Sequence, residues 1–429
     1  MKKFFILNVL LILTAMSGMA QQAQRDFAVD KAMSASNHYA YPGPLQEKLT
    51  AAPRGYKPFY ISHYGRHGSR YMCDKADYDI VYNTLQKADS AGKLTALGQE
   101  TLAKVSLLRQ RASNRLGELT ELGAEQHRGI AQRMYERFPE VFKGKVHVDA
   151  KSTVVIRCIL SMENALQELL RHNKQLIVTH DASEHDMWYM NFWDNKLHQN
   201  SAPEQTRKDL DEFTKRHVKY DRLLSSLFND EDYWHKAFNA ADFNSRLFKL
   251  AGGIQSTESR HDVTLYNLYT DDEIYGNWLQ TNAWWYIHYG AYAGNGARLP
   301  FIERRLLRKM IEETDSCLQY DRPGATLRYG HETCVMPLAC LMELDNFGLS
   351  ISDLEQVEKS GWLNYRIFPM ACNVQMVFYR HKNKQKDILV KVLLNENEAR
   401  LPLTPVEGPY YKWSEVRQYY LDKLDTFQE

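Results

Sequence analysis

Short apolar runs, each about as long as one β-strand, recur along the chain between segments with helical spacing. The first run, KPFYISHYG, combines aromatic and β-branched residues and stops at Gly65, and the run ATLRYG stops at a glycine just before His331. A glycine after such a run is typical of the end of a strand. We therefore expect strands at residues 57–65, 152–158, 175–180, 325–330, 376–380 and 388–395.

Helical patterns follow at least two of these runs. The segment ETCVMPLACLMEL after His331 is helical in pattern. After residues 152–158, apolar side chains recur every three or four positions, at Ile159, Met162, Leu166, Leu169 and Leu170. Strands that alternate with helices predict the α/β class, here an open Rossmann-like sheet with helices on both faces.

Residues 181–310 have a different pattern. Segments such as DLDEFTKRHVKYDRLLSSLF and NWLQTNAWWYIHYGAYAG have helical spacing and many aromatic residues, and no strand-like run interrupts them. The simplest interpretation is a mostly α-helical cap domain inserted into an α/β core domain of residues 21–180 and 311–429. Its tryptophans and tyrosines are expected to fill its core, because small helical domains need large side chains to bury.

The first twenty residues (1–20) are typical of a secretory signal peptide. Lys2 and Lys3 precede the apolar run FFILNVLLILTAM, and small residues follow up to Ala20, where we expect cleavage. This run is too short for a stable membrane span, and no later segment is apolar over the length of one. No cysteine follows the cleavage position, so a lipid anchor is not expected. The protein is predicted to be periplasmic or secreted.

Composition and charge narrow the possible functions. The 429-residue chain has 44% hydrophobic and 25% charged residues, which is ordinary for a soluble globular protein. Of its 54 basic residues, the signal peptide removes Lys2 and Lys3, which leaves 52 against 53 acidic residues and a formal charge of −1. A chain with this charge has no overall positive electrostatic potential that would attract nucleic acid, so any anion must be bound by a local cluster of charges.

The cysteines leave their chemistry open. They lie at Cys73, Cys158, Cys317, Cys334, Cys340 and Cys372. No two of them form a CxxC pair, which argues against a zinc ribbon or a thioredoxin-type motif. An exported chain can form disulfides, but cysteines in long chains are also often buried small hydrophobic residues. Whether one or two disulfides form, and between which cysteines, stays open.

Charged residues and histidines, which can bind ligands or take part in catalysis, lie where the predicted strands end. They are Arg66, His67 and Arg70, then Arg157, then His331 and Glu332. Ligands of open α/β sheets bind in the crevice at the carboxyl ends of the strands, so we expect these side chains to converge. Three guanidinium groups at one place favour a phosphoryl group or sulfate, and the helix N-termini that follow add N–H donors.

Each signal also has an ordinary structural interpretation. HYGRHGSR is compatible with a solvated basic turn, and Arg157 with a surface ion pair. A metal site is not expected, because HETCV lacks the second histidine of a zinc-protease helix. The spacing of four between His63 and His67 does not form a helical metal pair either, because glycines interrupt the segment. Together, the arginines, histidines and glutamate at the ends of three predicted strands indicate an anion site more specifically than any one of these motifs does alone.

The chain resembles the histidine acid phosphatases, which include phytases and multiple inositol polyphosphate phosphatases. RHGSR at 66–70 is similar to the Arg-His-Gly-x-Arg signature of that family. Further blocks resemble the family in the same order, namely LTELG (119–123), TVVIRCILSM (153–162), RYGHETCVMPL (328–338) and FPMACNVQMVFYR (368–380). The resemblance covers most of the mature chain. It is greatest to the inositol-polyphosphate branch, through NVQMVFYR and VKVLLNENEARLPL.

Two positions depart from the family pattern. Met72 stands where a proline usually follows the second arginine of the signature. His331 is followed directly by Glu332. The inositol-polyphosphate branch usually has an alanine between its histidine and glutamate, and other branches pair histidine directly with aspartate.

The resemblance implies a role for each residue at the strand ends. His67 attacks phosphorus and forms a phosphohistidine, Glu332 is the general acid, and the phosphate is bound by Arg66, Arg70, Arg157 and His331. The adjacent guanidinium groups disfavour an imidazolium, so the pKa of His67 should fall below its ordinary value of about 6.5. Protonation of a poor alkoxide leaving group contributes about 100- to 10,000-fold. No metal or cofactor is expected, because the arginines neutralise the phosphate.

The expected partner is a small phosphorylated molecule, with inositol hexakisphosphate and lower inositol polyphosphates favoured, and neither nucleic acid nor a membrane. Further phosphates need further cations, and the insertion and its flanks offer Arg207, Lys215, Arg216, Arg298 and Arg304. The alternatives are a broad-specificity acid phosphatase for sugar phosphates, a phosphotransfer isomerase and a non-catalytic anion-binding protein. Positional specificity and oligomeric state stay open.

Overall fold

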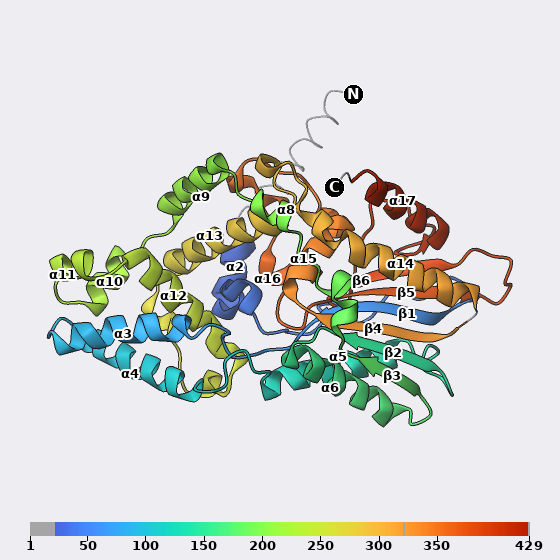
Figure 1. The fold of residues 1–429 in the computed structure, drawn as a ribbon, viewed down its shortest axis with the longest axis horizontal. Coiled ribbons are helices and arrows are strands. Elements are labelled where there is room, and N and C mark those ends of the chain that lie inside the picture. The colour runs from blue at the N-terminus through green and yellow to red at the C-terminus, as the bar shows by residue number, and fades with distance from the viewer. Residues whose placement is uncertain (1–21, 321, 428–429) are drawn as a thin grey trace, which may run out of the picture.

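A mixed β-sheet forms the centre of the α/β part of the protein (Figure 1). The computed structural model describes residues 22–320 and 322–427. The strand order is β3-β2-β4-β1-β5-β6-β7, and β8 also pairs with β6. Strands β3, β2, β4 and β1 are parallel, whereas β5 and β6 are antiparallel to their neighbours. The bounds are β1 Tyr56–Arg66, β2 His147–Ser152, β3 Ile177–Asp181, β4 Gly324–Gly330, β5 Asn373–His381, β6 Leu389–Leu394, β7 Asn397–Glu398 and β8 Tyr411–Lys412.

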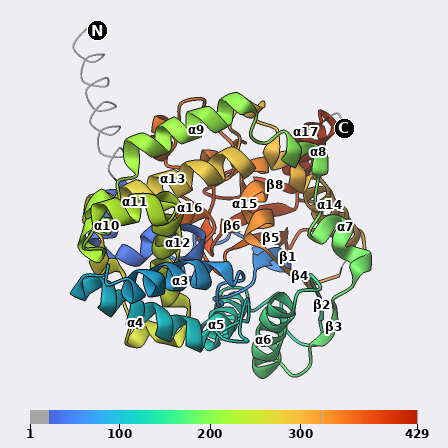
Figure 2. The same cartoon turned by 60° about the vertical axis from the view of Figure 1, so that its left-hand side comes forward.

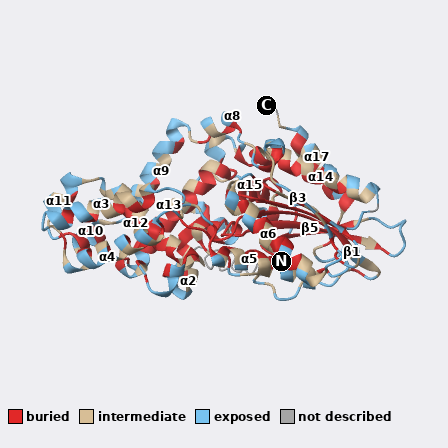
Figure 3. Ribbon diagram, turned by 60° about the horizontal axis from the view of Figure 1, so that its bottom comes forward, coloured by how far each residue is buried: buried red, intermediate tan, exposed pale blue. Residues whose placement is uncertain are grey.

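Helices cover both faces of this sheet. On one face, α5 and α6 share an apolar core with Ile61, Leu327 and Val377. On the other face, α14, α15 and α17 share a core with Tyr60 and Phe378. The bounds are α5 Glu121–Arg137, α6 Ile156–His172, α14 Arg304–Gln319, α15 Glu332–Leu341 and α17 Trp413–Asp425. The predicted open α/β sheet is thus confirmed, and Figure 3 shows its central strands as the buried core.

Two of the expected strands differ from the structure. The expected strand at 152–158 is wrong, because β2 ends at Ser152 and α6 begins at Ile156, which is 73% exposed. The alternating burial of Val148 and Ala150 marks the real strand, and its polar residues concealed the pattern. Strand β3, which corresponds to the apolar run expected as a strand at 175–180, begins at Ile177 and is mostly exposed, because it is the edge strand and pairs with β2 alone among the described strands.

A helical layer lies beside the sheet, at the left of Figure 1. The inserted segment begins with α7 Met187–Met190, which packs against α14, and α8 Asn195–Gln199. Its part of the helical layer contains α9 Glu204–His217, α10 Asp221–Leu227, α11 Glu231–Ala237, α12 Ala240–Gly253 and α13 Asp271–Tyr289. Two earlier helices, α3 (Ala76–Ser90) and α4 (Ala96–Arg111), pack against α12 and α10. The helical layer therefore uses more of the chain than the inserted segment, and the domain limits 21–180, 181–310 and 311–429 stay a prediction.

The beginning of the described chain joins this layer. Helix α2 (Gln22–Val29) leads into the 3-10 segment η1 (Lys31–His38), which packs against α12, α13 and α16 (Asn364–Ile367) (Figure 2). Further 3-10 turns are η2 Glu184–Asp186, η3 Ile254–Ser256, η4 Glu258–His261, η5 Tyr266–Leu268, η6 Ala293–Asn295, η7 Leu299–Glu303, η8 Leu344–Asn346, η9 Leu354–Gln356 and η10 Glu358–Ser360.

Two expectations concern the chain as a whole. The signal peptide assigned to residues 1–20 lies outside the described residues. Within residues 22–320 and 322–427, no helix has the length and apolar character needed to cross a membrane. All six cysteines are free thiols, and those at 158, 334, 340 and 372 are buried. The disulfides that the sequence left open are therefore not formed in this structure.

Candidate active site

The register of the sheet brings two of the predicted clusters together. Arg66, the last residue of β1, lies beside Gly330, the last residue of β4. The backbone N–H of His67 donates a hydrogen bond of 2.9 Å to the Gly330 carbonyl. The rings of His67 and His331 consequently lie 5.7 Å apart between centroids. They occupy the carboxyl end of the parallel strands, where ligands of such sheets bind.

The loop after β1 is fixed by the N-terminus of α5. The Ser69 carbonyl accepts hydrogen bonds from the N–H and the hydroxyl of Thr120, at 2.9 and 3.0 Å. A Cβ atom on Gly68 would lie 2.3 Å from the carbonyl oxygen of Gly123, so only glycine fits at this close approach of two backbones. The block LTELG thus supports the loop that carries RHGSR.

His67 is held as a neutral imidazole. Its Nδ1 lies 2.9 Å from the Gly68 carbonyl, which can only accept, so Nδ1 carries the hydrogen and Nε2 keeps its lone pair. Burial, followed by the charges of Arg66 and Arg70, lowers the pKa of His67 well below 6.5. The predicted direction is confirmed, although burial and not the arginines is the larger cause. A neutral imidazole with a free Nε2 is a competent nucleophile at acid pH.

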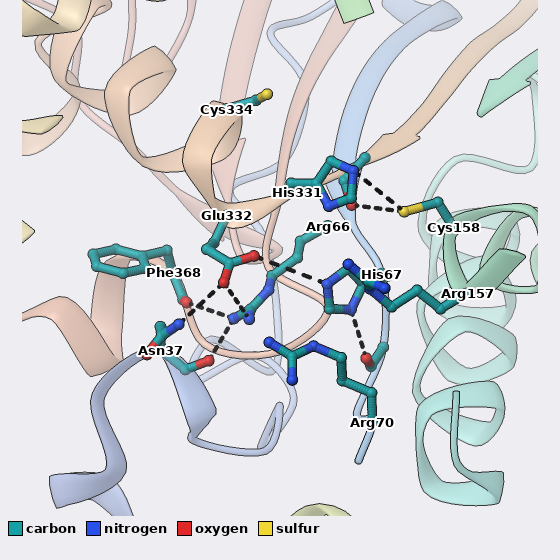
Figure 4. Close-up of polar contacts among 12 residues, drawn as sticks. Asn37, Arg66, His67, Arg70, Arg157, Cys158, His331, Glu332, Cys334 and Phe368 are labelled. Atoms are coloured by element: carbon teal, nitrogen blue, oxygen red, sulfur yellow. Dashed lines mark hydrogen bonds and ion pairs between the residues drawn. The ribbon is translucent and has the colours of Figure 1, made fainter. Parts of the chain in front are cut away.

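The guanidinium of Arg66 is fully buried and anchored at several points. Its Nη1 donates to the carbonyls of Asn37 and Phe368, at 2.5 and 3.2 Å. Its Nη2 forms an ion pair of 2.9 Å with Oε1 of Glu332 (Figure 4). These contacts fix the guanidinium before any substrate binds, as expected of a preorganised anion site.

The three arginines also retain donors without a protein partner. The Nε atoms of Arg66, Arg70 and Arg157 are buried and make no hydrogen bond within the described residues. Buried donors in proteins are normally satisfied, so such a group of unsatisfied guanidinium donors indicates a place for an anionic ligand.

Arg157 reaches the site from an unexpected element. It belongs to the first turn of α6, and not to the end of a strand as predicted. Helix α6 begins at the same edge of the sheet, and the charge of Arg157 is among those that lower the pKa of His67. A Cβ on Gly117 would lie 3.3 Å from both Nη1 of Arg157 and Sγ of Cys73. The N-terminus of a helix is itself favourable for an anion.

Glu332 is the carboxylate of the site. It is the first residue of α15, and its Oε2 lies 3.9 Å from Nε2 of His67. Burial alone would raise the pKa of this carboxyl, but the charges of the neighbouring guanidinium groups, above all those of Arg66 and Arg70, offset it and hold the pKa well below 4.5. The direct succession of His331 and Glu332 is therefore compatible with a carboxylate that reaches the catalytic histidine.

His331 is a neutral member of this group of site residues. Burial lowers the pKa of His331 to about 4, and the Glu332 carboxylate only partly opposes this effect. Its Nε2 lies 3.2 Å from the hydroxyl of Thr153 and 3.9 Å from Sγ of Cys158. At neutral pH, His331 can therefore offer a hydrogen bond but no positive charge.

A metal ion fits this site less well than an anion. Ligand atoms of His67, His331 and Glu332 lie within 4.8 Å of one another, close enough for a cation in geometric terms. Three guanidinium groups around a single carboxylate make the electrostatic potential unfavourable for a divalent cation. The absence of a metal stays a prediction.

All six predicted residues thus gather at one edge of the sheet. Sequence reasoning missed one side chain in this group, Asn37, whose amide donates a hydrogen bond of 3.0 Å to Oε1 of Glu332. It lies in the polar stretch SASNH before the first strand, where no spacing or composition signal distinguishes it from a linker.

The fold and the site can be compared with known proteins. Among solved structures, the Bifidobacterium longum multiple inositol polyphosphate phosphatase in complex with inositol hexasulfate gives a TM-score of 0.78 at 19% identity, over 90% of this chain and 97% of that chain. The phytase from D. castellii gives a TM-score of 0.64 at 13% identity, over 92% of this chain and 85% of that chain. Hafnia alvei phytase in complex with tartrate gives a TM-score of 0.53 at 12% identity, over 87% of this chain and 98% of that chain.

These structures establish the fold, and a family profile establishes the relationship. A search of curated proteins gives no match. The profile of the histidine phosphatase superfamily, branch 2, matches residues 65–395, which contain the signature loop, Arg157 and the His331–Glu332 pair. The chain therefore belongs to branch 2 of the histidine phosphatase superfamily and is a phosphatase.

Proposed function

We propose that the protein hydrolyses phosphomonoesters through a phosphohistidine at His67, with inositol polyphosphates as its substrates. The observation that carries the catalytic part is the state of His67. Its Nδ1 hydrogen is engaged by Gly68, and its Nε2 is unprotonated and faces the carboxylate of Glu332 among three arginines.

The first step is an in-line displacement at phosphorus. The lone pair on Nε2 of His67 forms an N–P bond while the ester P–O bond breaks. The leaving alkoxide takes the proton of the Glu332 carboxyl group, so a neutral alcohol departs. Guanidinium groups of Arg66, Arg70 and Arg157 bind the equatorial oxygens as charge shifts in the transition state.

The second step restores the enzyme. The Glu332 carboxylate accepts a proton from water, the water oxygen forms a bond to phosphorus, and the N–P bond breaks. Inorganic phosphate leaves, His67 regains its lone pair, and Glu332 carries the proton for the next turnover. Atoms and charges balance with water as the only co-reactant.

Substrate binding has to change the protonation of Glu332. In the ligand-free site this carboxyl group is ionised, because Arg66 and its neighbours hold its pKa well below 4.5. A phosphate dianion beside it competes for the same guanidinium charge and repels the carboxylate. Both effects raise the pKa of Glu332 in the complex, which allows it to act as the acid.

A cavity next to the site supports a bulky substrate. Its volume is about 890 Å³, and Asn37 and His38 of η1 line it. None of the six proposed site residues lines the cavity, and Asn37 connects it to the site through the hydrogen bond to Glu332. Helices of the cap line the rest, with the cations Lys215, Lys219 and Lys249. A substrate with several phosphates needs such cations beyond the place of cleavage.

Of the five cations expected to bind further phosphates, only Lys215 lines this cavity. Arg216 pairs with Glu355, and Arg304 pairs with Asp194. Arg298 stacks on Phe427, and Arg207 donates to the carbonyl of Ala202. These four side chains do not line the cavity, so the proposed contribution to substrate binding is confined to Lys215, together with Lys219 and Lys249. Lys249 also forms an ion pair of 2.7 Å with Asp77.

The substrate assignment is tested by comparing rates. Inositol hexakisphosphate should be dephosphorylated at least as fast as glucose 6-phosphate, with stronger inhibition by salt because the substrate is a polyanion. Lys215→Ala should raise KM for the hexakisphosphate several-fold and leave KM for an aryl phosphate unchanged. Lys236→Ala, on exposed α11, is the matched control. Rapid cleavage of sugar phosphates with no action on the hexakisphosphate would indicate a general acid phosphatase.

We further propose that the protein is exported, on the basis of the pattern in residues 1–20. Removal of this segment should leave Gln21 as the first residue of the mature chain. N-terminal sequencing of the protein from its native host tests this, and a chain that retains Met1 contradicts it.

A further inference from the structure

Asn37 is placed between the two charged groups that control the acid chemistry of the site. Its side-chain Nδ2 donates a hydrogen bond of 3.0 Å to Oε1 of Glu332, and its backbone carbonyl accepts one of 2.5 Å from Arg66 (Figure 4). The residue is 7% exposed. It lies outside the range 65–395 that the family profile matches, so the profile does not account for it.

The backbone around Asn37 is constrained to make these contacts. Ser36, the preceding residue, has φ 59° and ψ −127°, a sparsely populated conformation for a residue other than glycine. The carbonyl of Tyr39 accepts a hydrogen bond of 2.8 Å from Met370, which ties η1 to the segment after α16. Strain of this kind persists only where surrounding structure imposes it, and here it places an amide against Glu332.

We propose that Asn37 is a positioning residue for the general acid, an inference that rests on the proposed function. Its amide and Arg66 both engage Oε1 of Glu332. Oε2 is left as the oxygen that faces Nε2 of His67, at 3.9 Å, and it is the atom that delivers the proton to the leaving group. Among the described residues, the hydrogen bonds of Asn37 join it to Glu332 and Arg66 and not to His67, so it acts through the general acid.

The same contact biases the protonation of Glu332, which also faces the guanidinium groups of Arg66 and Arg70 and the imidazoles of His38, His67 and His331. An N–H donor to a carboxylate favours the ionised form and lowers its pKa. When a phosphate takes up part of the Arg66 charge, the neutral amide of Asn37 stays as the fixed partner of Oε1. Asn37 therefore keeps the carboxyl group oriented through both protonation states, since an amide bond to Oε1 does not depend on the proton on Oε2.

Two variants test this inference in the full-length enzyme. Asn37→Leu removes the donor, so kcat for an alkyl phosphate should fall at least tenfold. The alkaline limb of the pH profile should move up by about one to two pH units. Asn37→Asp keeps the shape of the side chain and adds a second carboxylate, which should move the limb at least as far. The value of kcat/KM for an aryl phosphate, whose leaving group needs little protonation, should change much less in both variants.

Coupling to Glu332 separates positioning from a general structural role. In a Glu332→Gln background, Asn37→Leu should cause no further loss of kcat, because the group that it positions is already absent. Asn173→Leu removes the amide that donates to the carbonyls of Phe142 and Gly144 at the C-terminal end of α6, the end away from the site, and is the matched control for packing damage. It should leave the pH profile unchanged.

The outcomes are distinct. Equal losses on alkyl and aryl phosphates with an unshifted pH limb, or additive losses in the double variant, overturn the role of Asn37. The proposed function is checked separately by wild-type turnover of the aryl phosphate. A folded wild-type protein without this turnover overturns the proposed function, and the inference about Asn37 falls with it.

Discussion

Replacing His67 with alanine is expected to lower kcat by at least about 1,000-fold, because the displacement loses its nucleophile and the remaining groups can only orient phosphate and water. The loss should be similar for alkyl and aryl phosphates, since both need the N–P bond. Steady-state assays over a range of substrate concentrations measure it. The variant should still bind inorganic phosphate, because the guanidinium groups of Arg66, Arg70 and Arg157 are retained.

The control for this variant is His235→Ala, a histidine substitution on the exposed surface of α11. It should retain wild-type activity. Unfolding curves of both variants establish that the fold is intact. Turnover by a folded His67→Ala protein at more than a few per cent of the wild-type rate would rule out His67 as the nucleophile.

Replacing Glu332 with glutamine is expected to lower kcat for alkyl phosphates by about 100- to 10,000-fold, the range found for loss of a general acid. Glutamine keeps the shape of the side chain, and its carbonyl can still accept the hydrogen bond from Asn37. The value of kcat/KM for aryl phosphates, which reports the phosphorylation step, should fall much less, because their leaving groups depart without a proton. A series of esters with leaving groups of different pKa measures this difference.

The pH dependence of kcat follows from the same group. Wild-type activity requires protonated Glu332 in the complex, so kcat should fall as the pH rises through the pKa that this carboxyl has with phosphate bound. Glu332→Gln cannot lose a proton, and its profile should lack this limb. Neutral His67 is also required, but its pKa lies well below 6.5, so the acid limb appears only at low pH. An unchanged alkaline limb in Glu332→Gln contradicts the assignment.

The centre of the site could be predicted because its residues follow strands in the sequence. Strand β1 is apolar and ends in RHGSR, and β4 is apolar and ends before His331. Parallel neighbours end at the same edge, so convergence followed from topology alone. Arg157 was also assigned to this edge, although it belongs to a helix, because the helix after β2 starts where the strand stops.

Other features depend on tertiary contacts that leave no local pattern. Strand β2 carries Asp149 and Lys151 on its less buried side, so its sequence is less apolar than that of the segment that follows it. The strand was therefore predicted at the following apolar segment. Asn37 reaches Glu332 across 295 positions of the chain, and nothing in the residues around it indicates this contact. The ion-pair partners of Arg216 and Arg304, which are Glu355 and Asp194, likewise come from distant segments of the chain.

The central claim is that the reaction passes through a covalent phosphate on His67. The most direct measurement is rapid denaturing quench of Glu332→Gln during turnover of an aryl phosphate, followed by mass spectrometry of its peptides under non-acidic conditions. Phosphorylation should be fast with this leaving group, whereas hydrolysis should be slow without the base, so the intermediate should accumulate to about one phosphate per chain. Phosphate is expected on Nε2 of His67 and on no other residue. A quenched enzyme without covalent phosphate during measurable turnover, or with phosphate on another side chain, would contradict it.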